Sequence, residues 1–299
     1  MHEGGIDDPT MTEAPQRVPE TAGGKRRVAL ITGASAGIGA ELTRVFARNH
    51  FDLVLTSRRE DRLKELAGEL ERQYRAQSTI VPADLTEPDA PRRLFDSTKQ
   101  AGIAVDVLVN NAGYGLRGAY AETAWSAQAA FLRVMAVAVT ELCYLYLPGM
   151  VERGQGRILN VASVAGLVPG SPGMALYSAI KAYLIQFSQS LHAEYEERGI
   201  AVCVTCPGFT RTEFQSRAQM TDITDKRIPN ALWMRVDDVA EQAFDALMRN
   251  RSRHVPGLVN KAGVILLGKV LPRRLSLALA RSQTEELMVP AAGSRGSST

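Results

Sequence analysis

The sequence predicts an α/β fold with a doubly wound parallel sheet, and two features of the chain carry this prediction. The first is the alternation of short apolar runs with amphipathic stretches of helix length, the runs being 28–32, 53–56, 79–81, 105–109, 157–161 and 201–205. Near-continuous apolar strands that are separated by helices are typical of a parallel sheet covered on both faces. The second is a glycine-rich turn directly after the first run. Together they predict a single Rossmann domain.

The glycine turn joins the first predicted strand to a helix over 40–48, through Gly33, Gly37 and Gly39. Such a turn leaves backbone N–H groups unpaired at a helix N-terminus, where the peptide dipoles favour a bound phosphate. Glycines allow a pyrophosphate to approach the backbone, because a Cβ would hold it away. A nucleotide site is therefore expected, although an ordinary loop is the alternative that this motif alone leaves open.

Length and composition indicate where the folded domain begins and ends. The chain has 299 residues, of which 45% are hydrophobic and 22% charged, as in ordinary soluble globular proteins. Residues 1–25 are polar and rich in Gly and Pro, so we expect a disordered tail that is neither a secretory signal nor a membrane anchor. The Rossmann domain is expected over 26–254, followed by a basic, apolar, amphipathic extension and tail over 255–299.

The cysteines and charges argue against a metal or disulfide site and against nucleic-acid binding. Cys143, Cys203 and Cys206 are an odd number in apolar surroundings, which predicts reduced thiols in a cytoplasmic protein. Cys203 and Cys206 lie three apart on a predicted strand and so point to opposite faces, which argues against a shared metal or disulfide. The net charge of +3 hides a local excess, because residues 246–284 hold eight Arg and Lys but no Asp or Glu. This asymmetry weakens a nucleic-acid interpretation.

The loops at the carboxyl ends of the strands should form the site. Arg58 follows the second strand, 19 residues beyond Gly39, and no carboxylate precedes it. An acidic residue here would hold the ribose 2′-OH of NAD, whereas Arg can pair with the 2′-phosphate of NADP, so NADP(H) is favoured over NAD(H). The alternative is that Arg58 and Arg59 cap a solvent-exposed loop. Asp84 is either an acceptor for the adenine amino group or the N-terminal cap of a helix begun by Glu87.

Candidate catalytic residues follow the fifth strand. Ser163 comes first, and Tyr177 and Lys181 lie 14 and 18 residues further along. Residues i and i+4 share one helix face, so the ammonium can sit near the phenol and lower its pKa from about 10 toward the working pH. A phenol acting as general acid or base requires this shift. The Tyr-x-x-x-Lys pattern alone is weak evidence for a catalytic site, because Tyr and Lys at this spacing are usually no more than a pair on a helix surface.

Four motifs occur together and in order: Thr32-Gly-Ala-Ser-Ala-Gly-Ile-Gly39, Asn110-Asn-Ala-Gly113, Ser163 with Tyr177-Ser-Ala-Ile-Lys181, and Pro207-Gly-Phe-Thr-Arg-Thr212. On these motifs the chain resembles the short-chain dehydrogenase/reductase family from about Arg27 to His254. The resemblance implies direct hydride transfer between a nicotinamide and a carbonyl or alcohol, without a metal. Tyr177 would exchange the proton, Ser163 would hold the reacting oxygen, and Lys181 would lower the Tyr177 pKa and bind the ribose.

The resemblance also implies the residues that contact the cofactor. They are Thr32, Gly33, Ser35, Ala36, Gly37, Ile38, Gly39, Arg58, Asp84, Leu85, Asn110, Ala112, Gly113, Tyr177, Lys181, Pro207, Gly208, Thr210 and Thr212. One position departs from the family pattern. Met135 stands where many members carry an Asn that helps to hold a water between the active-site Lys and bulk solvent, and Met cannot donate a hydrogen bond. The enzyme is expected to work without this relay, and the alternative is a protein that binds or senses NADP(H) without turnover.

Substrate selection is expected to come from 209–234 and from the end of the chain. The polar segment 210–228 is interpreted either as a mobile lid or as a surface loop, with Phe209, Phe214, Met220, Ile223 and Trp233 available to cover an apolar ligand. The C-terminal extension is too interrupted for a membrane span. It packs on the pocket mouth or a partner copy, lies on an anionic membrane, or attracts a phosphorylated substrate such as an acyl-coenzyme A. These features favour a lipophilic ketone or alcohol and a homodimer or homotetramer.

Overall fold

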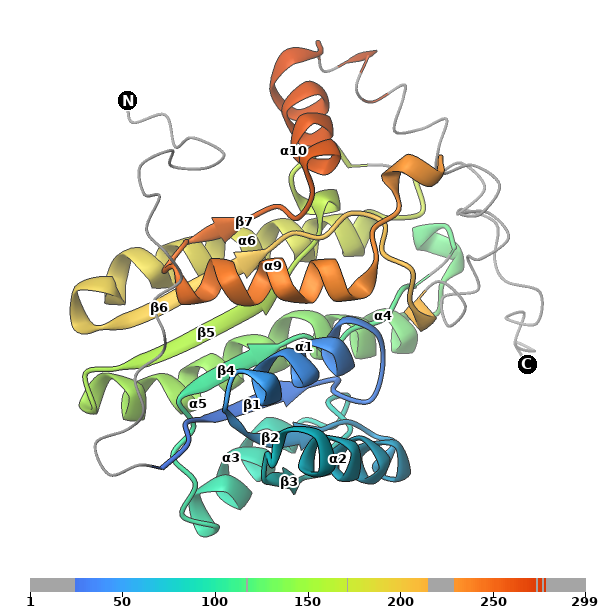
Figure 1. Ribbon diagram of the computed structural model, residues 1–299. Coiled ribbons are helices and arrows are strands. Elements are labelled where there is room, and N and C mark those ends of the chain that lie inside the picture. The colour runs from blue at the N-terminus through green and yellow to red at the C-terminus, as the bar shows by residue number, and fades with distance from the viewer. Residues whose placement is uncertain are drawn as a thin grey trace, which may run out of the picture.

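The computed structural model describes residues 25–116, 118–170, 172–214, 229–272, 274–275 and 277. Within these residues the chain forms one seven-stranded sheet in the order β3-β2-β1-β4-β5-β6-β7, and every pair of neighbouring strands is parallel (Figure 1). The chain runs outward from β1 to β3 and then returns to place β4 beside β1. This reversal confirms the doubly wound fold. The predicted N-terminal tail and most of the predicted lid lie outside the described residues.

The strands match the apolar runs of the sequence to within one or two residues. They are β1 (Val28–Thr32), β2 (Asp52–Thr56), β3 (Ser78–Ile80), β4 (Val107–Asn110), β5 (Gly156–Val161), β6 (Ile200–Thr205) and β7 (Arg253–His254). All of β4 and all of β6 are buried, as strands covered on both faces should be. The short edge strand β7 has no apolar run of its own and was not predicted.

The longer helices cover the two faces of the sheet. They are α1 (Gly37–Arg48), α2 (Glu60–Tyr74), α3 (Ala90–Gln100), α4 (Trp125–Leu132), α5 (Ala138–Glu152), α6 (Ala175–Tyr195), α9 (Val236–Met248) and α10 (Leu258–Ile265). Residues of α1, α2 and α9 pack in one apolar cluster, whereas α3, α5 and α6 contribute to another across the sheet. Helix α10 projects from the end of the domain beyond β7 (Figure 1).

Short helical turns complete the chain between these elements. The 3₁₀ turns are η1 (Tyr120–Glu122), η3 (Val164–Gly166), η4 (Glu196–Arg198) and η5 (Asn230–Leu232), and the π turns are η2 (Arg133–Val137) and η6 (Leu266–Val270). Turn η2 joins α4 to α5 without a break. The resulting helical stretch Trp125–Glu152 has the length and apolar composition of a membrane span, with a mean hydropathy of 1.6 over its most apolar window, of which 56% is buried. Leu142 and Met150 of this stretch lie in the core against the sheet, as in the core helix of a soluble domain.

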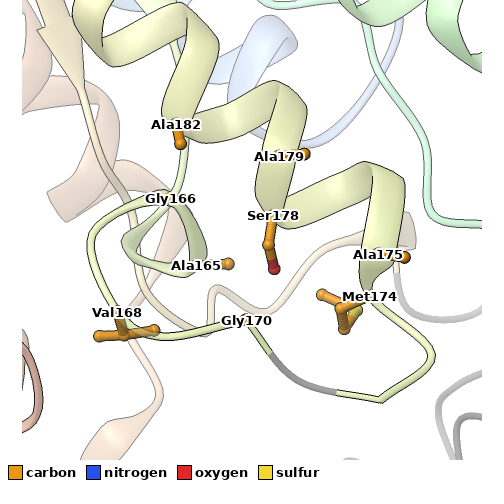
Figure 2. Close-up of a pocket in the computed structure, with 9 residues that line it drawn as sticks. All are labelled: Ala165, Gly166, Val168, Gly170, Met174, Ala175, Ser178, Ala179 and Ala182. Carbon is orange, nitrogen blue, oxygen red and sulfur yellow. The ribbon is translucent and has the colours of Figure 1, made fainter. Parts of the chain in front are cut away.

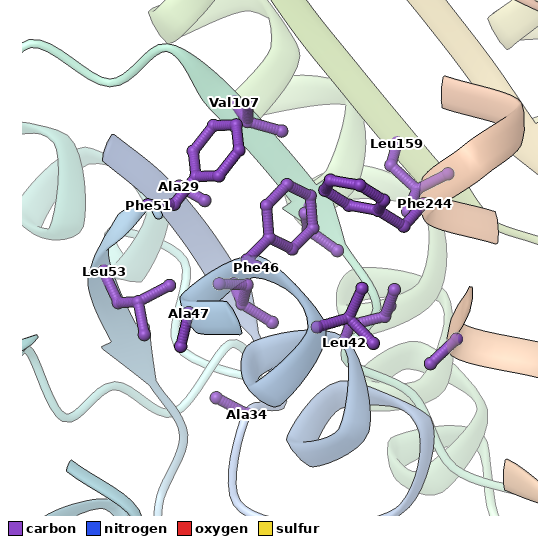
Figure 3. Close-up of a cluster of buried hydrophobic side chains, with 14 of the residues drawn as sticks. Ala29, Ala34, Leu42, Phe46, Ala47, Phe51, Leu53, Val107, Leu159 and Phe244 are labelled. Carbon is purple, nitrogen blue, oxygen red and sulfur yellow. The ribbon is translucent and has the colours of Figure 1, made fainter. Parts of the chain in front are cut away.

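Three aromatic rings fix α1 against α9. Phe46 lies edge-on to Phe51 and to Phe244, with ring centroids 5.1 and 5.0 Å apart (Figure 3). Edge-to-face pairs add about 0.5–1.5 kcal/mol each to the free energy of burying the rings. Because α1 begins at the glycine turn, this packing also fixes the direction in which the N-terminus of α1 points.

Candidate active site

The glycine turn has a backbone that side chains would obstruct. Gly33 and Gly37 have φ angles of 67° and 55°, in the left-handed region that favours glycine. A Cβ on Gly39 would collide with the Gly33 carbonyl and the Asn111 amide. The cap residue of α1, Ala36, offers no side-chain acceptor to the first N–H groups, and the first turn of α1 holds no acidic residue. This cradle fits the pyrophosphate of a dinucleotide.

Thr32 and Asn111 join the ends of β1 and β4. The Thr32 hydroxyl donates to the Val109 carbonyl at 3.2 Å and accepts from the backbone N–H groups of Asn111 and Ala112 at 2.9 and 3.0 Å. The Asn111 amide donates to the Thr32 carbonyl at 2.9 Å. These bonds hold the glycine turn at the switch point of the sheet. Asn111 was not among the predicted site residues, because its role depends on a strand 79 residues away.

At the end of β2, Arg59 contacts the glycine turn. Its guanidinium donates to the Ser35 hydroxyl at 3.1 and 3.3 Å and to the Ser35 carbonyl at 3.1 Å. The predicted residue, Arg58, is 67% exposed and lies 3.9 Å from Asp84. Arg59 is therefore a second candidate for binding the 2′-phosphate, and it is hydrogen-bonded to the predicted cofactor-binding residue Ser35.

Asp84 begins a tight turn. Its carboxylate accepts from the backbone N–H and the hydroxyl of Thr86 at 2.9 and 2.8 Å. Helix α3 begins only at Ala90, with Asp89 at the cap position. The alternative prediction that Asp84 caps a helix begun by Glu87 is therefore wrong, because the intervening residues form a turn. The neighbouring Leu85 is buried in the apolar core beside the site.

The Asn110 side chain is turned into the protein. Its amide donates to the Asn160 oxygen at 2.9 Å and to the Cys143 sulfur at 3.4 Å, and Asn160 donates to Ser188 at 2.8 Å. Asn110 is only 3% exposed. Asn110 therefore joins β4 to β5 and α5 through its side-chain nitrogen, whereas its side-chain oxygen is buried without a hydrogen-bond partner among the described residues.

Ser163, Tyr177 and Lys181 come together at the carboxyl end of β5. The Ser163 hydroxyl accepts from the Ala165 N–H at 3.2 Å, and it interacts with Tyr177 closely enough to lower the pKa of the phenol. Tyr177 and Lys181 lie one turn apart on α6, and the ammonium is 5.6 Å from the centre of the phenol ring. It donates to the Val161 carbonyl at 2.8 Å. The predicted catalytic residues thus occupy one cluster.

Burial shifts the pKa values of this cluster. It raises the pKa of Tyr177 above its usual range, an effect that the Ser163 hydrogen bond partly opposes. It lowers the pKa of Lys181 to about 8, because the ammonium loses its water. The pKa of Tyr177 is therefore raised by burial in this structure, and the expected lowering by Lys181 is not observed. A basic lysine beside a hydroxyl pair is an arrangement that can pass a proton to or from a substrate oxygen.

The loop after β6 is shaped by the C-terminal segment. The Pro207 carbonyl accepts from the Val164 N–H at 3.0 Å and faces the Ser163 hydroxyl at 3.4 Å. A Cβ on Gly208 would collide with Asn260 of α10. Asn260 also donates to the Pro256 carbonyl at 3.1 Å. Helix α10 therefore packs on the loop for which the nicotinamide contact was predicted.

Two further predicted residues lie on this loop. The Thr210 hydroxyl donates to the Gly208 carbonyl at 3.1 Å and so stiffens the turn. The Thr212 side chain lies 3.2 Å from the place where a Cβ of Gly37 would be. The loop after β6 thus closes against the glycine turn.

Met135 lies in the π turn η2 and is 1% exposed. Its sulfur lies 2.7 Å from the place where a Cβ of Gly113 would be, so Gly113 is needed to admit this side chain. π turns often occur at functional sites. The structure thus places Met135 against the predicted Asn110-Asn-Ala-Gly113 turn.

A cavity lies beside this cluster, between η3 and the first turns of α6. It has a volume of about 410 Å³ and is lined by Ala165, Gly166, Val168, Gly170, Met174, Ala175, Ser178, Ala179 and Ala182 (Figure 2). Ser178, Ala179 and Ala182 lie on a different side of α6 from Tyr177, by helical periodicity. The part of the cavity lined by α6 therefore lies on a side of the helix that does not carry the Tyr177 side chain.

The three cysteines are buried. Cys203 and Cys206 belong to separate apolar clusters on the two faces of the sheet, which confirms that they point to opposite faces. Burial raises the pKa of the Cys143 thiol to about 12. In the part of the chain that the structure describes, no group of three His, Cys, Asp or Glu side chains is placed to hold a metal.

The fold and this cluster define the protein as a nicotinamide-dependent oxidoreductase. Residues 27–223 match the family described as short chain dehydrogenase, and the chain belongs to that family. A short-chain dehydrogenase from Sphingobium yanoikuyae in complex with NADPH superposes with a TM-score of 0.72 and 30% identity, over 82% of this chain and 96% of that one. The bulky-bulky ketone specific alcohol dehydrogenase from Comamonas testosteroni superposes with a TM-score of 0.67 and 25% identity, over 90% and 97%.

Curated relatives are similar in sequence. The very-long-chain 3-oxoacyl-CoA reductase of Bos taurus is 33% identical over 193 residues, which are 62% of this chain and 60% of that protein. The chain thus spans about 60% of the length of such reductases. Sulfoacetaldehyde reductase 2 of Chromohalobacter salexigens is 33% identical over 224 residues, which are 73% of this chain and 86% of that one.

Proposed function

We propose that the protein reduces a lipophilic ketone or aldehyde with NADPH, or catalyses the reverse oxidation. The observation that carries this proposal is the single cluster formed by Ser163, Tyr177 and Lys181 at the carboxyl end of β5. Bound NADP(H) would supply or accept the hydride at its nicotinamide ring. The protein's own residues would then position the substrate oxygen and move one proton.

The proton is assigned to Tyr177. In reduction the phenol hydroxyl donates its proton to the substrate oxygen as negative charge develops there. The Ser163 hydroxyl holds the same oxygen, and its own orientation is set by the Ala165 N–H. The Lys181 ammonium then stabilises the phenolate left on Tyr177, because a nearby positive charge favours the charged form of a phenol.

The 2′-phosphate is assigned to Arg58 and Arg59. Both follow β2, and Arg59 is anchored on Ser35 of the glycine turn. A guanidinium can bind a phosphate through two parallel hydrogen bonds, which supports NADP(H) over NAD(H). The similarity to the NADPH complex from Sphingobium yanoikuyae supports the same choice.

Apolar side chains near the cluster support a lipophilic substrate. The Phe214 ring centroid is 6.1 Å from that of Tyr177, and the rings of Phe209 and Trp233 are 5.7 Å apart. Relatives that act on very-long-chain 3-oxoacyl-CoA and on bulky ketones agree with such a substrate. Met220 and Ile223, which were also predicted to cover the ligand, lie outside the described residues.

The proposal is tested by following NADPH oxidation with a panel of aliphatic, aromatic and long-chain ketones. Turnover that requires NADPH and falls by at least about 10²-fold in Tyr177→Phe is the expected result. Tyr195→Phe, in the last turn of the same helix, is the matched control and should retain full activity. Binding of NADPH without turnover of any ketone would contradict the proposal.

Binding of NADPH without turnover of any ketone would favour the second candidate function, that of a protein that binds NADP(H) without catalysing a reaction. One observation supports it: Met135 occupies a buried position against Gly113 and offers no hydrogen-bond donor. Binding of NADPH unaffected by Tyr177→Phe, together with no reaction, is its signature.

The C-terminal segment is proposed to form an interface with a second copy in a homodimer or homotetramer. The outward face of α10 and η6 is apolar, with Leu258 81%, Val259 52%, Leu266 48% and Val270 64% exposed. Such a face is normally covered. Leu258→Asp should shift sedimentation toward smaller species. Retention on anionic vesicles in a flotation assay, with sedimentation unchanged, would instead support contact of the segment with a membrane. Binding of coenzyme A would support the alternative that the segment attracts a phosphorylated substrate.

A further inference from the structure

Glu213 bridges two arginines at the predicted cofactor site. One carboxylate oxygen lies 3.2 Å from the Arg59 guanidinium, and the other lies 3.3 Å from that of Arg62. Arg59 is the same side chain that donates to Ser35 of the glycine turn. The loop after β6 and the start of α2, which are about 150 residues apart in sequence, are thus joined over the glycine turn.

The backbone sets this position of Glu213. The preceding residue, Thr212, packs against Gly37, where its Cβ lies 3.2 Å from the site that a Cβ of Gly37 would occupy. The Thr212 hydroxyl accepts from the Phe214 N–H at 3.2 Å, which closes a turn around Glu213. A closely packed loop therefore presents the carboxylate to Nη1 of Arg59, whereas Ser35 accepts from Nε and Nη2.

A carboxylate and a phosphate bind to a guanidinium in the same way. Both accept parallel hydrogen bonds from its N–H groups, and both gain from its positive charge. Glu213 is 41% exposed, so its ion pair with Arg59 is partly hydrated and is weak enough to be exchanged. A ribose 2′-hydroxyl, in contrast, can donate a hydrogen bond to a carboxylate.

We propose that Glu213 determines cofactor specificity by competing with the 2′-phosphate of NADP(H) for Arg59 and Arg62, while accepting a hydrogen bond from the 2′-hydroxyl of NAD(H). This inference rests on the proposed cofactor site. Glu213 lowers the preference for NADP(H) and widens cofactor use. It lies 154 residues beyond Arg59, so a search for a carboxylate directly after β2 does not find it.

The test compares Glu213→Gln with the wild type in the affinity for NADPH and NADH, measured by nicotinamide fluorescence. The charge is removed and the size is kept, so NADPH binding should tighten by about three- to tenfold while NADH binding stays constant or weakens. Adenosine 2′,5′-bisphosphate should gain affinity in the same way, and 5′-AMP should not. The gain should shrink in high salt, because exposed charges are screened.

Two control variants separate this role from a structural one. Glu69→Gln removes an ion pair of similar exposure with Arg44 and should leave both affinities unchanged. Glu213→Gln in an Arg59→Gln background should lose most of its effect on NADPH. An equal change for NADPH and NADH, or weaker NADPH binding in Glu213→Gln, would overturn the inference.

The outcomes also separate this inference from the proposed function. If the wild type prefers NADH and Glu213→Gln shifts the affinity ratio toward NADPH, the assignment of NADP(H) fails and the role of Glu213 stands. If the wild type prefers NADPH and the ratio is unchanged in the variant, the proposed cofactor stands and the role of Glu213 fails. If neither cofactor binds, both fail.

Discussion

The Lys181 ammonium is buried beneath the Tyr177 ring, 5.6 Å from its centroid, and donates a 2.8 Å hydrogen bond to the Val161 carbonyl. A carbonyl stabilises a positive charge less than a carboxylate does, so burial determines the pKa of this lysine. The folded protein therefore holds Lys181 with a pKa of about 8, below the value of about 10.4 in an unfolded chain.

This difference predicts how stability depends on pH. Between pH 8 and 10.4 the unfolded state binds more protons at Lys181 than the folded state, so the free energy of unfolding rises with pH in this window. The rise attributable to Lys181 is about 3 kcal/mol. Urea denaturation of the wild type and Lys181→Met from pH 7 to 10.5 measures it, because the variant lacks the group and shares all the others. A constant difference between the two proteins across this range would contradict the pKa.

Gly39→Ala should damage the glycine turn. The added methyl group meets the Gly33 carbonyl and the Asn111 amide, neither of which can move without breaking the junction between β1 and β4. We expect a loss of about 1–3 kcal/mol in stability and at least about tenfold weaker cofactor binding, measured by denaturation and fluorescence titration. Gly263→Ala is the control, because its Cβ meets nothing within 4 Å and alanine favours the helix. Unchanged cofactor affinity in Gly39→Ala would show that the turn does not hold the nucleotide.

Asn111→Ala tests the same junction from the other side. The amide that donates to the Thr32 carbonyl is lost, which leaves a partly buried acceptor without this donor. Stability should fall by about 1–3 kcal/mol, and the affinity for cofactor should fall with it. Asn49→Ala provides a matched control far from the turn, because it removes one hydrogen bond from a side-chain amide to a backbone carbonyl at the end of α1. If both variants affect cofactor binding equally, Asn111 has no special role.

The local parts of the site could be predicted from sequence, whereas the contacts between distant segments could not. The glycine turn and the spacing of Tyr177 and Lys181 each lie within one strand–helix unit, so periodicity places them. The contact of Arg59 with Ser35 depends on how two loops meet.

The packing of Asn260 on Gly208 likewise depends on the course of the C-terminal segment. Asn110 shows the same limit. Its motif places it at the end of β4, but the hydrogen bond from its side chain to the buried Asn160, 50 residues away, could not be read from the motif. Short motifs thus locate residues, and tertiary contacts decide where their side chains point.

Met135→Asn should increase turnover. Met135 fills a buried position beside Gly113 in the π turn η2, and it offers no donor for the water relay that the family resemblance implies between Lys181 and solvent. An Asn there can hold a water by hydrogen bonds, and we expect kcat to rise severalfold, less than the 10²- to 10⁴-fold of direct acid–base catalysis. Steady-state rates across pH measure the gain, and Met135→Leu, which keeps the volume without adding a donor, should show none. Because the position is 1% exposed, denaturation of both variants must accompany the rates. An unchanged kcat in a stably folded Met135→Asn protein would mean that the proton reaches solvent by another route, for which Met135 is no obstacle.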